Sequence, residues 1–273
     1  MTSEPGGPQS RDELEKENLR LTRRLQRLEG NVRRLEEFQD SNSTLASRLL
    51  TELEAERARS EQLLLNVLPQ RIIDRLEAGE TLIADRHEEV CVLFGDIVGF
   101  TEISARLEPA ALVAEMNELW SGFDAICERT GVEKIKTIGD AYLAIGGLDG
   151  GTDHAAAIAE TALQMIERVG SESGHGGAWR VRIGLHSGPA VAGVIGTTKF
   201  AYDVWGDTVN VAARLEGASE PNRIHVSATL AAQLEDRYIL TPRGSVELKG
   251  KGLVETCFLL GRRPSTVAST ARR

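Results

Sequence analysis

Apolar residues recur every seven positions through residues 11–67, and this repeat is the strongest constraint on how the chain can fold. The segment is rich in charged residues and contains one glycine and no proline. One column of the repeat holds leucine and the second holds mixed apolar residues: Leu14, Leu21, Leu28, Leu35, Leu49 and Leu63, then Leu25, Val32, Ala46, Leu53 and Val67. Two such columns are typical of a two-stranded parallel coiled coil. The repeat therefore predicts a long dimerising helix.

Polar residues interrupt both columns: Asn18, Gln39, Asn42, Glu56 and Ser60. In addition, Gly30 costs about 1 kcal/mol relative to alanine inside a helix. A polar residue at a core position can fix register and oligomeric state at a cost in stability. The alternative is that the interruptions mark where the helix frays or ends.

Residues 68–86 form a predicted helical linker. Pro69 lacks an N–H and disfavours helix in the residue before it, so the first helix ends there. A short amphipathic helix follows over residues 70–78, with Ile72 and Ile73 on its apolar face, and Gly79 stands where a C-cap glycine would.

Short β-rich segments alternate with helical patterns from residue 87 to residue 261. The expected strands cover 90–94, 132–138, 141–145, 179–186, 190–195, 224–226, 238–248 and 254–260, and the expected helices cover 109–129, 154–169 and 208–218. This order predicts an α+β fold, a ferredoxin-like sandwich in which helices cover a largely antiparallel sheet. Residues 1–10 and 262–273 are expected to be disordered.

Composition excludes several classes of partner. A formal net charge of −9 and an aromatic content of 4% disfavour nucleic-acid binding. No apolar run approaches the roughly 18–20 residues that span a bilayer, and no signal peptide is evident. Cys91, Cys127 and Cys257 lack the spacing of a zinc site or a disulfide framework. We therefore expect a cytoplasmic protein whose cysteines are reduced packing residues.

Two aspartates are candidate metal ligands. Asp96 follows the buried strand at 90–94 and precedes a glycine-containing turn, and Asp140 lies in the Gly-Asp turn between the strands at 132–138 and 141–145. If these strands are neighbours, both carboxylates reach one end of the sheet, where they could bridge two divalent cations. The alternative for each is an ordinary turn or N-cap aspartate.

Asn210 and Arg214 stand four residues apart in a predicted helix, so they share one of its faces. The amide can donate and accept, and the guanidinium suits phosphate oxygens. A solvated helix face is the alternative.

Five segments in sequence order resemble the signatures of class III adenylate/guanylate cyclase catalytic domains, over about residues 85–260. They are FGDIVGFT at 94–101, EKIKTIGD at 133–140, RIGLHSG at 182–188, YDVWGDTVN at 202–210 and LKGKG at 248–252. No required position of the motif set is missing, although Gly95 is an unusually small residue beside Asp96.

The resemblance implies a homodimer whose two catalytic domains pair head to tail and build two active sites at their interface. Asp96, Asp140 and the backbone carbonyl of Ile97 would hold two divalent cations, Mg²⁺ or Mn²⁺. Arg182 would contact phosphate from the same side, and backbone N–H groups at Phe100 and Thr101 would face the phosphates.

The second copy would complete each site. In the resemblance, Lys136 and Asp203 match the residues that select the purine, Asn210 and Arg214 match the transition-state pair, and Lys249 contacts the terminal phosphates. A lysine can only donate, which suits N1 of adenine, and an ionised aspartate can only accept, which suits the N6 amine. Guanine presents the reverse pattern, and guanylate cyclases of the family carry an acidic and a small residue at these places. The resemblance therefore implies conversion of ATP to 3′,5′-cyclic AMP and pyrophosphate.

Three alternatives remain at this point: a guanylate cyclase, a diguanylate cyclase, for which the acidic Gly-Gly loop is absent, and a nucleotide-binding module without catalysis. His186 lies near a signature segment, but a lone histidine there is more often a packing residue.

The coiled coil is expected to set dimer orientation, with input from a regulatory protein or a small ligand.

Overall fold

The structure is a computed structural model that describes residues 11–171, 179–196 and 198–264. The expected disordered segments at 1–10 and 262–273 lie outside the described residues except for residues 262–264, of which Arg262 ends a strand. The chain divides after Pro69 into two compact units, which are considered separately. Among the described residues, no helix combines the length and the apolar character that crossing a bilayer requires.

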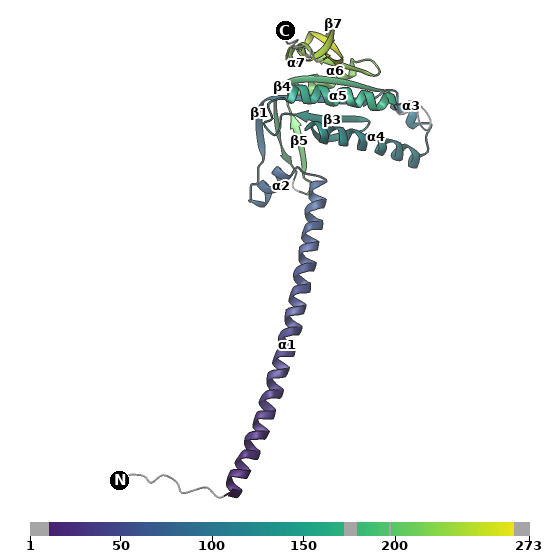
Figure 1. The fold of residues 1–273 in the computed structure, drawn as a ribbon. Helices are drawn as coiled ribbons and strands as arrows, with labels where there is room; N and C mark the ends of the chain where they lie inside the picture. The colour runs from purple at the N-terminus through teal and green to yellow at the C-terminus, as the bar shows by residue number, and fades with distance from the viewer. Residues whose placement is uncertain (1–10, 172–178, 197, 265–273) are drawn as a thin grey trace, which may run out of the picture. The chain divides into compact units, whose positions relative to one another are not determined.

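The first unit is a single helix, α1 (Arg11–Leu65), 55 residues long (Figure 1). The helix continues through Gly30 and through every polar interruption, so the alternative in which it ends in the middle is wrong. Its leucines are exposed, from 43% for Leu64 to 66% for Leu53. An isolated helix gains no burial from such a stripe, and the pairing of two helices would provide it. The coiled coil itself stays a prediction.

The second unit contains the ferredoxin-like motif that the sequence predicts. Its elements are β1 (Ala84–Ile97), α3 (Phe100–Ser104), α4 (Pro109–Thr130), β2 (Glu133–Ile138), β3 (Ala141–Gly146), α5 (His154–Ser171) and β4 (Val181–Ile195). The four strands lie in the order β2-β3-β1-β4 with antiparallel neighbours. This is the arrangement of a β-α-β-β-α-β unit.

The rest of the chain widens this sheet to eight strands. It adds β5 (Ala201–Trp205), α6 (Asp207–Gly217), β6 (Arg223–Ser227), α7 (Ala228–Leu234), β7 (Tyr238–Leu248) and β8 (Gly252–Arg262). Beyond β4 the order is β6-β8-β7, and β5 pairs with β4. The β4–β6 pair is parallel, and the other described pairs are antiparallel. The sequence analysis missed β5 and α7, which are too short for a clear periodicity.

One strand replaces the two that were expected at 179–186 and 190–195. Strand β4 continues through Pro189, where two residues of β1, between His87 and Val90, stand opposite this single proline. The bulge accommodates a residue that has no N–H to donate to the ladder. Strand β1 begins at Ala84, before the expected start of the domain at residue 87, and β8 ends at Arg262.

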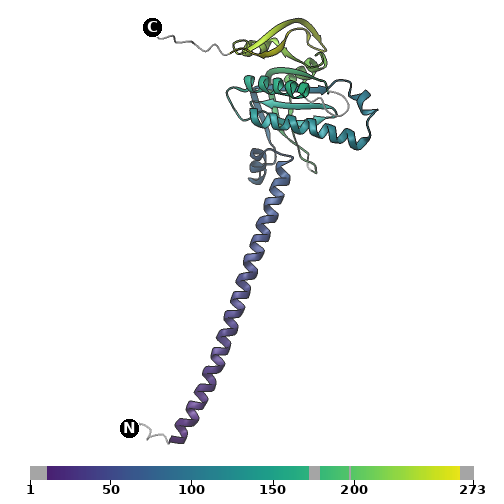
Figure 2. The same cartoon turned by 45° about the vertical axis from the view of Figure 1, so that its right-hand side comes forward.

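Helices cover both faces of the sheet. The main core lies between the sheet and α4, α5 and α7, with Phe123, Tyr142 and Ile158 fully buried. Figure 2 shows α4 and α5 alongside each other over the strands. Side chains alternate along a strand, so Ile183 and Leu185 of β4 face this core while Gly184 faces α6.

Helix α6 lies directly on Gly184. A β-carbon at this position would stand 2.2 Å from the backbone nitrogen of Glu216 and 2.4 Å from the carbonyl oxygen of Ala212. Both atoms belong to the helix backbone and cannot rotate away. Glycine is therefore required for the helix to approach this strand.

Helix α2 (Gln70–Glu77) belongs to the second unit. Ile72 and Ile73 are buried, at 1% and 4% exposure, which confirms the predicted apolar face. Arg75 forms ion pairs with Glu80 and with Asp85 at the start of β1. Most of the segment expected to be a linker thus belongs to the second unit.

We predict that Gly184→Ala lowers the free energy of unfolding by about 2–3 kcal/mol, because the added methyl group overpacks the contact with α6. Gly95→Ala is the matched control on the neighbouring strand. There the nearest atom to an added β-carbon would be 3.8 Å away, and the change should stay below about 1 kcal/mol. Urea unfolding of both variants checks this, and equal losses would contradict it.

Candidate active site

The two aspartates come together where β1 ends. Asp96 is paired with Ala141 of β3, and Asp140 directly precedes Ala141 in the tight turn that follows β2. Gly139 makes this turn with a φ of +64°. Burial raises the pKa of Asp140, and the nearby charge of Asp96 raises it further. The predicted juxtaposition of two carboxylates is therefore present in the fold.

Arg182 of β4 stands opposite Asp96 across the strand pair. Its Nη2 donates to Asp96 Oδ2 at 2.6 Å, and its Nε lies 3.2 Å from Glu216 Oε1. The second contact lacks hydrogen-bond geometry, and both of its atoms are buried without a hydrogen-bond partner. The arginine is thus held between two carboxylates but is fully bonded to only one.

Glu216 is a site residue that the sequence analysis missed. It is only 9% exposed, and burial, followed by the charge of Asp96, raises its pKa to about 7. The signal that could have found it is its spacing, because it follows the buried Thr208 and Ala212 at intervals of four residues on one face of α6.

The residues present fit a divalent cation bound together with a nucleotide. No group of three or more His, Cys, Asp or Glu side chains suited to a metal ion occurs among the described residues. Mg²⁺ commonly takes only one or two protein carboxylates and completes its shell with substrate phosphates and water. Two mutually repelling carboxylates at a strand end match that requirement.

The turn after β1 leads into α3. Gly99 has a φ of +74° and caps the helix, a conformation that favours glycine. Phe100 packs against the main core, while Thr101 is exposed. The expected role of the N–H groups here toward phosphate stays a prediction.

Lys136 and Asp203 form an ion pair that joins β2 to β5. A bulge in β2 positions the lysine, since Lys134 pairs with Ala144 and Lys136 with Leu143, which leaves Ile135 unpaired. The structure therefore brings together the two residues that were predicted to select the purine.

The outer face of α6 carries Asn210 and Arg214. Asn210 is exposed, and Arg214 Nη1 is 4.0 Å from where a β-carbon on Gly250 would be. Residues two positions apart in sequence project about 200° apart around a helix axis. Arg214 therefore points away from Glu216 and from the aspartates beside Glu216. Arg214 thus faces the turn between β7 and β8.

That turn carries two lysines. Lys251 forms an ion pair with Asp207 in the first turn of α6. Lys249, the predicted phosphate contact, is exposed and has no ion pair to any residue that the structure describes.

His186 is half-buried and makes a polar contact within the fold. Its Nδ1 lies 2.8 Å from Ser227 Oγ, and burial lowers its pKa. Ser227 in turn caps α7.

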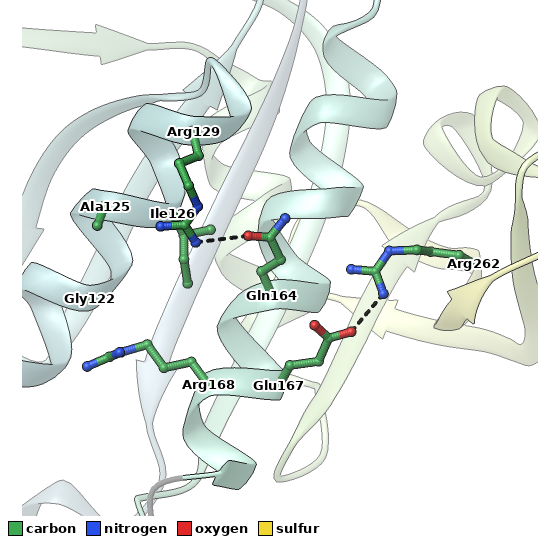
Figure 3. A pocket seen from close by; sticks show the side chains of 8 residues that line it. All are labelled: Gly122, Ala125, Ile126, Arg129, Gln164, Glu167, Arg168 and Arg262. Carbon is green, nitrogen blue, oxygen red and sulfur yellow. Dashed lines mark hydrogen bonds and ion pairs between the residues drawn. The ribbon is translucent and has the colours of Figure 1, made fainter.

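A separate surface cavity of about 590 Å³ lies between α4 and α5 (Figure 3). Its lining includes Arg129, Arg168 and Arg262, and Arg129 donates to Gln164 at 3.1 Å while Arg262 pairs with Glu167 at 2.7 Å. None of its lining residues is among the predicted site residues.

Comparison with known proteins agrees with this geometry. A sequence model of the "Adenylate and Guanylate cyclase catalytic domain" matches residues 82–261. The chain therefore belongs to the adenylate and guanylate cyclase catalytic domain family.

Similar proteins carry both names. An "Adenylate cyclase" of Mycobacterium tuberculosis is 43% identical over 214 residues, which cover 77% of this chain and 48% of that protein. "Guanylate cyclase D" of Mus musculus is 42% identical over 243 residues, covering 86% of this chain and 22% of that protein. The chain thus spans about half the length of the former relative and about a fifth of the latter.

Among solved structures, the guanylate cyclase domain of RhGC from Catenaria anguillulae in complex with GTP is similar with a TM-score of 0.64 and 38% identity. The alignment covers 66% of this chain and 100% of the chain from Catenaria anguillulae. The adenylyl cyclase CyaB from P. aeruginosa is similar with a TM-score of 0.61 and 27% identity. That alignment covers 66% of this chain and 97% of the CyaB chain.

We predict a pH-dependent stability that originates at Glu216. A raised carboxyl pKa means that the folded state favours the protonated form, so this stability is present below the ordinary pKa of 4.5 and is lost as the pH rises through about 7. Between pH 4.5 and about 7, the free energy of unfolding of the wild type should fall by about 2–3 kcal/mol relative to that of Glu216→Gln. Urea unfolding in a chelator at several pH values checks this, and a constant difference would contradict it.

Proposed function

We propose that this chain is an adenylate cyclase that converts ATP to 3′,5′-cyclic AMP and pyrophosphate. The observation that carries the proposal is the Lys136–Asp203 ion pair, in a chain that also has the pair of aspartates expected of the family. The contact places a donor-only group and an acceptor-only group within reach of one base edge. Adenine, with an acceptor at N1 and a donor at N6, complements this pair.

Asp96, Asp140 and the carbonyl of Ile97 would hold two divalent cations, Mg²⁺ or Mn²⁺. These ions would lower the pKa of the ribose 3′-hydroxyl and offset the charge of the triphosphate. Arg182 now donates to Asp96, and the same guanidinium would donate to phosphate oxygens once a cation engages that carboxylate.

The remaining residues act on the nucleotide itself. Asn210 would orient the ribose so that its 3′-hydroxyl lies in line with the α-phosphorus and the departing pyrophosphate. Arg214 would donate to the charge that develops on the α-phosphate, and Lys249 would bind the terminal phosphates. The N–H groups at Phe100 and Thr101 would complete the phosphate contacts.

Each site would draw on two copies of the chain, paired head to tail. Arg214 points away from the aspartates of its own chain, as the helix geometry of α6 requires, so it is placed to serve a nucleotide bound by a second copy. Helix α1, with its exposed leucine stripe, would hold the two copies together and set their orientation. A regulatory protein or a small ligand that acts on this helix would then control activity.

Guanylate cyclase activity is the second candidate, because relatives of that name are 42% identical. Guanine has a donor at N1 and an acceptor at O6, so Lys136 and Asp203 would each face a like partner. Mismatched buried polar groups of this kind weaken the binding of the wrong base, by a factor between several-fold and about a thousand-fold. The side chains therefore favour ATP.

A product assay tests the proposal. Dimeric protein is incubated with ATP or GTP, each with Mg²⁺ or Mn²⁺, and we expect cyclic AMP as the main product. Asp140→Ala should lower the rate at least about 100-fold, because it removes a ligand of the cations that stabilise the transition state. Asp149→Ala, an exposed loop carboxylate, is the matched control and should retain activity. Cyclic GTP as the main product, or no cyclic product at all, would overturn the proposal.

We also predict that removal of residues 1–67 weakens dimerisation and lowers activity at low protein concentration. The truncated chain retains the whole second unit but loses the leucine stripe of α1. Analytical ultracentrifugation and the product assay over a concentration series measure both effects. Unchanged dimerisation and activity at equal concentration would show that α1 has no role in assembly.

A further inference from the structure

Helix α2 is joined to two strands through one side chain. Arg71 donates to both carboxylate oxygens of Glu133 on β2, at 2.6 Å and 3.0 Å, and its Nη2 also donates to the hydroxyl of Tyr202 on β5 at 2.7 Å. The guanidinium lies 5.4 Å from the centre of the Tyr202 ring. Bidentate, charge-assisted bonds of this kind define geometry as well as energy.

The partners of Arg71 are close neighbours of the purine pair. Tyr202 directly precedes Asp203. Glu133 and Lys136 are paired with Ile145 and Leu143 of β3, and these two positions share one face because they are two residues apart. The bulge at Ile135 thus places the carboxylate that Arg71 binds on the same face as Lys136.

The two strands that carry the pair are weakly joined to each other. In the described sheet, β2 pairs only with β3 and β5 pairs only with β4. No backbone ladder joins β2 to β5 in the described sheet, and side chains connect them: the Lys136–Asp203 ion pair and the contacts of Arg71. Glu133 is 23% exposed at its side chain and Tyr202 is 8% exposed overall, so the contacts of Arg71 are partly shielded from water.

A bound base would change this balance. Lys136 and Asp203 would then share their hydrogen-bonding capacity with the purine, so the contacts of Arg71 would carry more of the link between β2 and β5. We infer that Arg71 is a positioning residue that sets the spacing of Lys136 and Asp203, and hence the preference for adenine. The inference rests on the proposed function, in which this pair recognises the base.

Arg71→Gln tests the inference, with Arg75→Gln as the matched control. Arg75 is on the same helix and loses ion pairs to Glu80 and Asp85, but it contacts neither β2 nor β5. Binding of 3′-deoxy-ATP and 3′-deoxy-GTP with Mg²⁺ is measured by calorimetry on the full chain. Both nucleotides lack the attacking hydroxyl, so binding is measured without turnover.

Arg71→Gln should reduce the preference for the adenine nucleotide about tenfold, a change equal to the loss of one good hydrogen bond, while Arg75→Gln changes it less than about twofold. In the product assay KM for ATP should rise with little change in kcat, since binding rather than chemistry is affected. Arg71→Lys keeps the charge without the bidentate geometry and should lie between wild type and Arg71→Gln.

Thermal unfolding separates positioning from general stability. Equal loss of stability in Arg71→Gln and Arg75→Gln, with altered base preference only in the former, supports the inference. An unchanged preference in Arg71→Gln overturns it. If that variant does not fold, Tyr202→Phe, which removes only one acceptor, takes its place and must show the same direction of change.

The outcome for the wild type distinguishes this inference from the proposed function. A wild type that prefers the adenine nucleotide but forms no cyclic product refutes the cyclase proposal and leaves the Arg71 comparison decisive. A wild type with no preference between the two bases overturns the inference.

Discussion

The contact between helix α6 and Gly184 sets the distances on which the candidate site depends. Because the helix backbone rests on the strand, its inner face brings Glu216 against Arg182, which in turn holds Asp96. Its outer face carries Asn210 and Arg214 away from the sheet. One helix, held at a fixed distance from the sheet, therefore carries residues of both halves of the proposed site.

The two halves of the site differ in how firmly the fold holds them. Asp96 is on β1, which has hydrogen-bonded neighbours on both sides, whereas Lys136 and Asp203 are on strands that are paired on one side along the segments that carry them. The proposed cation-binding half is thus built into the centre of the sheet. The proposed base-binding half depends on side-chain contacts, and these include the contacts of Arg71 on helix α2.

Much of this arrangement could be predicted from the sequence, because it depends on local patterns. The Gly-Asp turn and its flanking strands placed Asp140 beside Asp96, and the helical period of α6 placed Asn210 beside Arg214. Bulges, long-range contacts and buried carboxylates were not predictable. Arg71 meets Glu133 and Tyr202 across 62 and 131 residues of sequence, and no local pattern indicates such a pairing. Glu216 resembles any helical surface glutamate until the packing of α6 is known.

The unpaired Ile135 in β2 shows that residue identity alone does not determine which base the chain would bind. The bulge changes the parity of the strand, so that a lysine three positions after Glu133 shares its face instead of opposing it. A second strand with the same letters but without the bulge would turn Lys136 toward the opposite face. The local backbone of β2, as well as the identity of the lysine, therefore decides whether Lys136 can meet Asp203.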